Sequence, residues 1–490
     1  MKRAFTHRSG SFLLTVGVAL AIGFGLRWWI LGTSLGQLSA DEAYTGLQAF
    51  RILDGDRPIV IEGQAYTAVL DSYLLAPIIA LFGASVLVLK WLTAFWWLAA
   101  SVVVGTLASR IAGPREGILA AIVCWLAPGS LLVLSTRGYE GYGLGLLVTM
   151  SVAVLARRSA EEKEPRIPTS VLLGLCSGLV LYIHPMYAAT ALPMVLVPAW
   201  IHRRRLRSWM SPALLGAVAI NIPFLAWNAR NEWASFTQPT PTDIGYIERL
   251  FGLFGGLLPR SFGLRDGDGS WVLPWPITAL VGVSLLASVI VGFRHLWAHS
   301  PGGRVLAAPL VACWPIMALF SNLAFVADGR YGIIPFPFIV IAFAVGLGLI
   351  FGSDRWVPTS SAAILLWVVL LIVPWLGSNA GSRIGDPNSD VEEVIEVLES
   401  AGVDKVSGSF WWVLPVEYLS GRQIRGAVTG TPFAVRVIDS QTIVTGTPDA
   451  EVAYVFAVGD EQTEVLRSPV DSYRRVEVGA AVVYLPIATD

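Results

Sequence analysis

Charged residues are scarce in this chain. Asp, Glu, Lys and Arg together make up 14% of its 490 residues, whereas a soluble globular domain carries roughly 25%. Hydrophobic residues reach 54%, and the mean hydropathy is +0.64. This composition excludes an ordinary soluble enzyme.

A surplus of basic residues is also missing. The chain has 34 Lys and Arg residues against 35 Asp and Glu residues, and its net charge is −1. Proteins that bind nucleic acid neutralise the phosphates with an excess of Lys and Arg. We therefore expect no nucleic-acid partner.

Cysteine is rare, and its placement excludes two further classes. Cys124, Cys176 and Cys313 all lie inside apolar runs, far from one another. They lack the spacing of metal ligands and are too scattered for a disulfide framework. We read them as small core residues.

Long apolar runs dominate the chain instead. A helix needs about 17 to 25 apolar residues to cross a bilayer, and we find about eleven such runs. The run after Met1 continues to about residue 31 without a clear cleavage site, so we expect it to be retained as the first span. The run at 68–83 is short and contains Asp71 and Pro77, so we expect it to lie in the outer interface. The predicted spans are 11–32, 86–108, 117–136, 141–156, 169–186, 187–201, 211–228, 274–293, 305–326, 333–352 and 360–377.

The arginines predict the orientation of these spans. With 68–83 not crossing, one side of the membrane receives nearly all the basic loops, and short basic loops face the cytoplasm. The N-terminus is then cytoplasmic, and loops 33–67, 137–140, the turn at His184-Pro185, 229–273 and 327–332 face outward. The residues on the basic side are Lys2, Arg3, Arg8, Arg110, Arg115, Arg157, Arg158, Lys163, Arg166, Arg203, Arg204, Arg205, Arg207, Arg294, Arg304 and Arg355.

The composition changes after residue 377. Residues 391–400 have helical spacing, whereas 451–458 and 476–486 read as buried strands. The sequence therefore predicts a transmembrane domain over 1–377 and a small α/β domain over 378–490. An odd number of spans places that α/β domain outside the cell.

The most informative polar segment is the outer loop 33–67. Asp41 and Glu42 follow the first predicted span and begin a helix that ends near Leu53. The apolar residues of this helix fall on one arc, so we expect it to lie flat on the membrane. Ser39 and Glu42 have capping-box spacing, which would explain both acids structurally. Equally, a carboxylate held rigidly at a helix start suits a general base.

Several outer-face motifs resemble those of the GT-C superfamily of membrane glycosyltransferases. The nearest named relatives are the protein O-mannosyltransferases of glycosyltransferase family 39 and the lipid A aminoarabinose transferases. The resemblance covers about 11–377, and the soluble tail is similar to that of bacterial members. It depends on the acid pair Asp41-Glu42, on the segments 62–67 (EGQAYT) and 73–77 (YLLAP), on Arg137-Gly138-Tyr139-Glu140, and on Arg330-Tyr331 followed by 333–335 (IIP).

The resemblance implies a sugar donor linked to polyprenyl phosphate and inversion at the anomeric carbon. The acceptor would be a protein, lipid or glycan on the outer face. Asp41 matches the acidic residue that acts as base or positions the acceptor, sometimes beside a divalent cation such as Mg²⁺ or Mn²⁺. Glu42 would be its partner or a metal ligand. Many relatives carry a further Asp where this chain has Glu140, which leaves the role of Glu140 and of any metal open.

The residues themselves fit this chemistry. Arginine binds phosphate oxygens in bidentate fashion, so Arg137, Arg330 and Arg27 are candidates to hold the leaving phosphate. Snorkelling to lipid headgroups is their alternative role. The candidates for substrate binding are Glu62, Gln64, Tyr66, Tyr139, Glu140 and His184, each of which also has a structural explanation.

Two other functions compete with glycosyl transfer. A transporter or flippase of lipid-linked sugars would carry ionisable residues near the bilayer midplane and related halves with interrupted helices. Here the charges gather at one face. A non-catalytic membrane scaffold presenting the tail domain would not need the acid pair.

Overall fold

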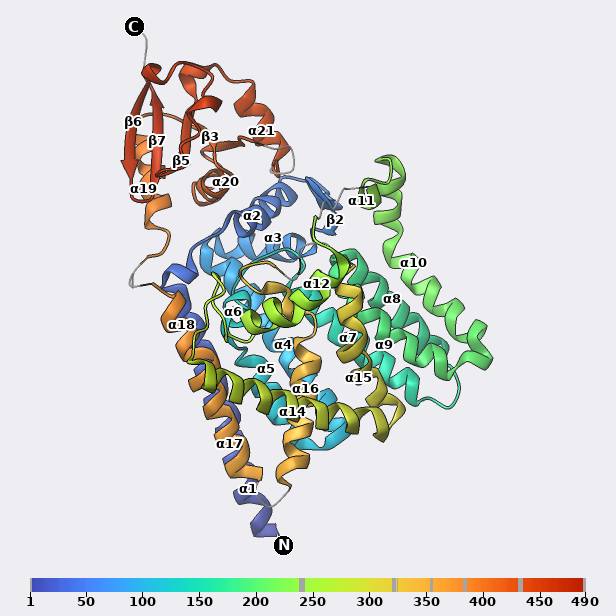
Figure 1. Ribbon diagram of the computed structural model, residues 1–490. Coiled ribbons are helices and arrows are strands. Elements are labelled where there is room, and N and C mark those ends of the chain that lie inside the picture. The colour runs from blue at the N-terminus through green and yellow to red at the C-terminus, as the bar shows by residue number, and fades with distance from the viewer. Residues whose placement is uncertain are drawn as a thin grey trace.

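Figure 1 shows the computed structural model, which describes residues 2–237, 243–319, 323, 325–352, 356–381, 386–430 and 435–487. A helical body carries a small sheet domain at one end. The N-terminal end of α1 lies at the opposite end of the molecule from the sheet domain (Figure 1).

Helices make up the body. Those of the first half are α1 (Lys2–Leu31), α2 (Ala40–Leu53), α3 (Leu70–Phe82), α4 (Val86–Ala112), α5 (Pro114–Trp125), α6 (Gly129–Leu134), α7 (Gly143–Glu161), α8 (Ile167–Ile183), α9 (Ala188–Ile201) and α10 (Leu206–Arg230). Those that follow are α11 (Ala234–Thr237), α12 (Tyr246–Gly252), α13 (Leu258–Ser261), α14 (Trp275–His299), α15 (Pro301–Met317), α16 (Phe336–Phe351), α17 (Trp356–Trp367) and α18 (Val373–Asn379).

Among the described residues, six helices are long and apolar enough to cross a membrane, and four shorter apolar helices accompany them. The membrane character of the chain is therefore confirmed, whereas the number of eleven spans stays a prediction. The helices pack in pairs: α8 with α10, α4 with α5, α14 with α16, and α9 with α15.

Three predicted spans differ from the helices observed. The span 117–136 is broken into α5 and α6 at Ala127-Pro128, because proline lacks the N–H that a helix interior needs. The span 360–377 is continuous but contains a π-helical turn, Val368–Ile372, between α17 and α18. The span 305–326 is helical as α15 to Met317, and its residues 320–322 and 324 lie outside the described residues.

Loops predicted to share the basic side of the membrane meet one another. Arg205, before α10, pairs with Glu164, after α7, at 2.6 Å. His202 Nε2 lies 2.8 Å from the Ser159 carbonyl oxygen, and Gly302 lies against the Glu161 side chain. The arginine pattern therefore sorted these loops onto one face, although which side that face meets is still a prediction. Arg355 lies outside the described residues.

The C-terminal domain is the α/β unit that the sequence predicts. Its helices are α19 (Ser389–Ser400), α20 (Phe410–Leu419) and α21 (Ile438–Thr445). Its sheet has five strands in the order β4-β3-β5-β7-β6, of which β4, β3 and β5 are parallel and the others antiparallel. The strands are β3 (Lys405–Gly408), β4 (Arg425–Val428), β5 (Ala453–Ala457), β6 (Tyr473–Val478) and β7 (Ala481–Pro486).

One predicted strand of this domain is wrong in extent. Residues 476–486 are not a single strand, because the end of β6 and all of β7 form a hairpin there. Gly479 makes the turn with φ +55°, a conformation that glycine adopts without steric cost.

Helix α2 does not lie exposed on a membrane surface. Its apolar residues Ala43 and Leu47 are buried in a cluster with Val413 and Val416 of α20, so the C-terminal domain covers the arc that we expected to face lipid. The contact is close: a Cβ at Gly46 would lie 2.2 Å from the Tyr418 ring. Helix α3 supplies Leu75, Ala76 and Ile79 to the same cluster. Loop 33–67 and the C-terminal domain therefore share one core.

Candidate active site

Segments that are distant in sequence converge beside the N-terminal end of α2. They enclose a cavity of about 70 Å³ that contains the Asp41 carboxylate, which we call the Asp41 cavity. Seven of the eleven predicted site residues line it, from four segments that the arginine pattern assigned to the same face. The lining residues are Asp41, Tyr44, Ile61, Gln64, Tyr66, Thr67, Tyr139, Glu140, Tyr142, His184, Arg330, Tyr331 and Arg436.

The two acids at the start of α2 occupy different environments. Glu42 forms the predicted capping box: its Oε2 accepts from the Ser39 backbone N–H at 3.1 Å, and the Ser39 hydroxyl accepts from Glu42 N–H at 3.3 Å. The Glu42 side chain is fully buried, whereas that of Asp41 is 37% exposed. Capping therefore explains Glu42 and leaves Asp41 facing the cavity.

Cations surround the Glu42 carboxylate. Lys90 Nζ lies 2.8 Å from Oε1, Arg137 Nη1 lies 2.9 Å from Oε2, and the Gly138 N–H donates to Oε1 at 2.9 Å. Burial alone would raise the pKa of Glu42, but these partners outweigh burial and lower the pKa to about 2. Glu42 therefore stays ionised.

This arrangement does not fit a divalent cation held by Asp41 and Glu42 together. Both Glu42 oxygens already accept hydrogen bonds from cationic or N–H donors, and Arg330 lies beside Asp41. Mg²⁺ and Mn²⁺ require several oxygen ligands at one point. No group of three or more His, Cys, Asp or Glu side chains suitable for a metal occurs within the described residues.

Asp41 is paired with arginine but only loosely. Arg330 Nη1 lies 4.0 Å from Asp41 Oδ2. Burial raises the pKa of Asp41 above its ordinary value, while the positive charges of Arg330 and Arg436 oppose that rise. The side chain is thus a carboxylate with raised basicity, open to a cavity and flanked by cations, which suits a general base.

A tight backbone contact positions Arg330. The arginine begins the 3₁₀ turn Arg330–Ile333 after Gly329, whose φ is +64°. Ser261, at the end of α13, donates its hydroxyl to the Gly329 carbonyl at 2.7 Å. The rings of Tyr139, Tyr142 and Tyr331 lie within 6.0 Å of the Arg330 guanidinium carbon, the distance at which cation–π attraction acts.

A second cavity, of about 270 Å³, adjoins the first through Tyr139 and Arg330, which line both. Its walls hold Arg137, Arg260, Arg265 and Arg330, against the acids Asp266 and Asp328. We call it the arginine cavity. Arg330 Nε lies 3.8 Å from the Asp328 carboxylate, and the Arg265 guanidinium carbon lies 4.1 Å from the centre of the Trp271 ring. Four guanidinium groups against two carboxylates give the cavity wall an excess of positive charge, which suits an anion such as phosphate.

An aromatic wall closes the other side of the Asp41 cavity. The His184 ring lies 5.8 Å from Tyr66 and 6.0 Å from Tyr142, in edge-to-face geometry. His184 Nδ1 accepts from the Met186 N–H at 3.2 Å, which accounts for its place before Pro185 as a turn residue. Its ring still reaches the cavity.

Glu140 lies in the cavity wall but is held by α3. Its oxygens accept from the backbone N–H groups of Asp71 at 3.1 Å and Ser72 at 2.9 Å, and the Ser72 hydroxyl also donates to it. Burial, and then the charge of Asp71, raise the pKa of Glu140. The dipole of a helix stabilises a carboxylate at the helix N-terminus. Glu140 therefore has a structural role at the start of α3.

Three predicted residues have other partners. Arg27 is fully buried, donates to the Gly23 and Trp125 carbonyls at 3.0 Å and lines neither cavity. Arg137 lines the arginine cavity but is tied to Glu42 and to the Gln37 carbonyl, the latter at 2.6 Å. Glu62 accepts from Arg51 at 2.7 Å and contacts the C-terminal domain instead of the cavity.

Five residues of the two cavities that carry this chemistry were not selected from the sequence. Tyr331 belongs to a quoted motif and Tyr142 lies two residues after another, so proximity in sequence was an available signal. Arg260 and Arg265 lie in loop 229–273, which was predicted to face outward, and their basic charge on that side was the signal. No signal in the sequence pointed to Arg436, because it belongs to the C-terminal domain, far along the chain from the other residues of the cavity.

Comparisons with known proteins reveal a shared fold. ArnT from Cupriavidus metallidurans in the apo state aligns over 98% of both chains with a TM-score of 0.64 and 12% identity. ArnT bound to undecaprenyl phosphate aligns over 97% of this chain and 98% of that chain, with a TM-score of 0.53 and 13% identity. The archaeal oligosaccharyltransferase AglB from Archaeoglobus fulgidus, in complex with an inhibitory peptide and a dolichol-phosphate, aligns over 90% of this chain and 69% of that chain, with a TM-score of 0.51 and 12% identity. No protein-family profile and no curated protein matches the sequence.

Proposed function

We propose, from the GT-C fold of this chain and from its arginine cavity, that it is a membrane glycosyltransferase with a polyprenyl-phosphate-linked sugar as donor. The single observation that carries the proposal is the arginine cavity itself. Its walls hold four arginines against two acids, and the cavity shares Tyr139 and Arg330 with the cavity of Asp41. A phosphate group there would place the adjoining sugar beside the carboxylate.

The two cavities divide the chemistry of transfer between them. The acceptor hydroxyl must lose a proton, and Asp41 is the base that we assign to this step. The leaving phosphate gains charge as the bond to the anomeric carbon breaks, and Arg260, Arg265 and Arg330 would stabilise that charge. We expect inversion, with the acceptor hydroxyl attacking from the Asp41 side, opposite the bond to a phosphate in the arginine cavity.

The segment 259–265, which begins in α13, supports a lipid-linked donor. Arg260 and Arg265 face the arginine cavity, whereas their sequence neighbours Pro259, Phe262 and Leu264 line an apolar cavity of about 490 Å³. One short segment therefore presents arginines to a polar space and apolar side chains to a space suited to a hydrocarbon chain. The structural neighbours that bind undecaprenyl phosphate and dolichol-phosphate agree with this assignment.

Binding of the sugar requires side-chain movement. The Asp41 cavity, at about 70 Å³, is far below the roughly 300 Å³ from which small-molecule pockets ordinarily start. The rings of Tyr66, Tyr142, Tyr331 and His184 occupy the space beside Asp41, and rotamer changes at a binding surface are common. The acceptor, a protein, lipid or glycan, would approach on the outer face together with the C-terminal domain.

Purified protein tests the proposal. The assay supplies undecaprenyl phosphate bearing a radiolabelled pentose or hexose, and an envelope extract as acceptor. Wild type should transfer label, and Asp41→Asn should lower the rate by about 10² to 10⁴, the usual cost of losing a general base. Arg265→Ala should weaken donor binding by roughly ten- to a hundredfold, because a hydrogen bond to a charged group is lost.

The matched control is Arg474→Ala, which removes an exposed arginine of the C-terminal domain and should leave transfer unchanged. Turnover by Asp41→Asn at the wild-type rate would remove Asp41 from the mechanism. Translocation of the lipid-linked sugar by wild type, without any transfer, would instead favour a transporter.

A further inference from the structure

One residue of the Asp41 cavity comes from the C-terminal domain. Arg436, in the segment that enters α21, is 4% exposed and lines the cavity together with Asp41, Tyr44 and Tyr66. It does not line the arginine cavity. The C-terminal domain therefore completes the wall of the site rather than merely lying above it.

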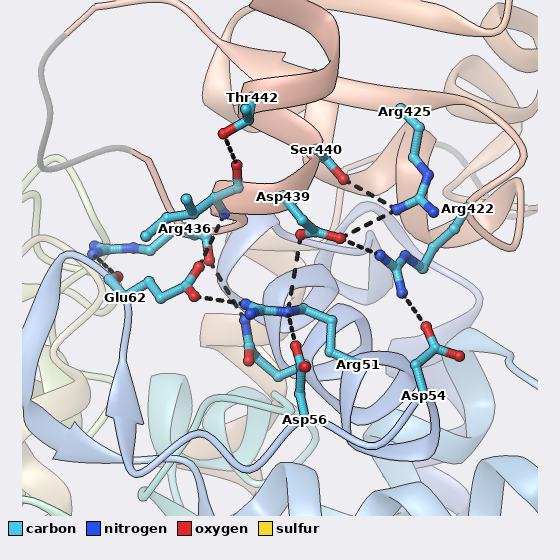
Figure 2. A network of polar contacts seen from close by, with 12 residues as sticks. Arg51, Asp54, Asp56, Glu62, Arg422, Arg425, Arg436, Asp439, Ser440 and Thr442 are labelled. Atoms are coloured by element: carbon cyan, nitrogen blue, oxygen red, sulfur yellow. Dashed lines mark hydrogen bonds and ion pairs between the residues drawn. The ribbon is translucent and has the colours of Figure 1, made fainter. Parts of the chain in front are cut away.

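Glu62 holds the segment around Arg436 in place through hydrogen bonds. Its backbone carbonyl accepts from Arg436 Nη1 at 3.0 Å, and its carboxylate accepts from the Ile438 N–H at 3.0 Å. Arg51 in turn donates to the other oxygen of Glu62 at 2.7 Å (Figure 2). Glu62, which the sequence predicted to bind substrate, therefore holds Arg436 through its backbone carbonyl and the neighbouring Ile438 N–H through its carboxylate.

Ion pairs extend this junction into α21. Arg422 joins Asp439 at 2.5 Å and Asp54 at 2.7 Å, and Arg51 lies 3.9 Å from Asp439 (Figure 2). Networks of this kind add geometric precision more than stability. The junction therefore gives Arg436 a defined position relative to α2 and Asp41.

The position of Arg436 separates it from the donor phosphate. In the proposed reaction the phosphate lies in the arginine cavity, and the acceptor oxygen enters opposite the breaking bond, next to Asp41. Arg330 belongs to both cavities, but Arg436 lines only the Asp41 cavity, where the acceptor oxygen must arrive and where the donor sugar also lies. The KM values for donor and acceptor therefore distinguish which of the two Arg436 binds. A guanidinium presents several fixed N–H donors and binds oxygen atoms.

We infer that Arg436 is a substrate-binding residue of the acceptor side, contributed by the C-terminal domain, and that it binds oxygen atoms of the acceptor next to the hydroxyl that reacts. This inference rests on the proposed function. It makes the C-terminal domain part of the transfer site, with Glu62 and Arg51 as the positioning residues of Arg436.

Steady-state kinetics of the full-length protein test the inference. The donor is undecaprenyl phosphate carrying the radiolabelled sugar that wild type transfers, and the acceptor is a serially diluted envelope extract. Arg436→Ala should raise the apparent KM for the extract by about ten- to a hundredfold, with the donor KM within about twofold of wild type. Arg436→Lys, which keeps the charge but loses the planar fork, should lie in between.

A pH profile provides a readout that a purely structural role would not move. The charges facing Asp41 are those of Arg330, Arg436, Glu42 and Asp328. Removal of the Arg436 charge should raise the pKa of Asp41 further, so the acidic limb of the rate profile should move to higher pH in Arg436→Gln. Glu62→Gln, which keeps both Arg436 and its charge, should raise the acceptor KM with a smaller pH shift.

Each outcome has a distinct meaning. Unchanged acceptor KM in Arg436→Ala, or a uniform loss of rate together with a lower melting temperature and an unmoved pH limb, would overturn the inference while leaving the transferase intact. Absence of transfer in wild type with every donor would instead overturn the proposed function. Arg474→Ala again serves as the control.

Discussion

At the scale of single residues, two adjacent acids have separate tasks. Spacing alone allowed both Asp41 and Glu42 to be capping residues or catalytic groups, because a capping box and a general base both place acids at a helix start. The structure assigns the cap to Glu42, which Lys90 and Arg137 enclose. No sequence pattern could supply this, since Lys90 lies 48 residues away from Glu42.

Glu42→Gln should therefore destabilise the protein strongly. Removing one member of a buried ion pair leaves the other charge uncompensated, at a cost of about 3 to 5 kcal/mol. A melting curve in detergent measures the effect, with Asp41→Asn as the control that should melt near wild type. Glu42→Gln combined with Lys90→Met should recover only part of the loss, because the buried Lys90 charge is then absent while Arg137 still lacks its partner. A variant Glu42→Gln as stable as wild type would contradict the role of this pair.

The same carboxylate predicts how stability changes with pH. The pKa of Glu42 in the folded protein is about 2, below its ordinary value of 4.5. Its contribution is thus fully present above about pH 4.5 and is lost as the pH falls toward 2. Wild type should lose more stability than Glu42→Gln across this interval.

At the scale of elements, periodicity identified the right faces but not their partners. The apolar arc of α2 is real, yet α20 covers it rather than lipid. A hydrophobic pattern records that a face is buried, and it contains no information on which surface buries it. Regular periodicity correctly predicted the helix α19. It did not predict the π-helical turn of Val368–Ile372 or the hairpin at Gly479, which do not change the apolar character of their segments.

Gly46→Ala tests the contact between α2 and the C-terminal domain. The added Cβ would lie 2.2 Å from the Tyr418 ring, and overpacking of this kind typically costs about 1 to 3 kcal/mol. We expect a lower melting temperature and faster proteolytic release of the C-terminal domain. The matched control is Gly25→Ala, where nothing lies within 4 Å of the new Cβ. Rescue of Gly46→Ala by Tyr418→Ala would confirm the clash, and a Gly46→Ala variant that behaves as wild type would refute it.

At the scale of the whole molecule, charge asymmetry was the most productive signal. It placed five segments on one face, and four of them, namely 33–67, 137–140, the turn at His184-Pro185 and 327–332, do meet around Asp41. What it could not provide is the content of the cavities. Arg260, Arg265 and Arg436 become neighbours of Asp41 or of the donor site only through the folded chain, and a single sequence does not record such long-range contacts.

The orientation of the molecule follows from the same asymmetry and is open to direct test. In a background with Cys124, Cys176 and Cys313 replaced, single cysteines are placed at the exposed positions Ser270, Ser472 and Ser208. Short basic loops remain cytoplasmic, so an impermeant thiol reagent should label intact cells at positions 270 and 472 but not at 208. After permeabilisation all three should react, which controls for accessibility. Labelling of position 208 alone in intact cells would show that the protein has the opposite orientation. Asp41 would then face the cytoplasm, where an acceptor on the outer face could not reach it.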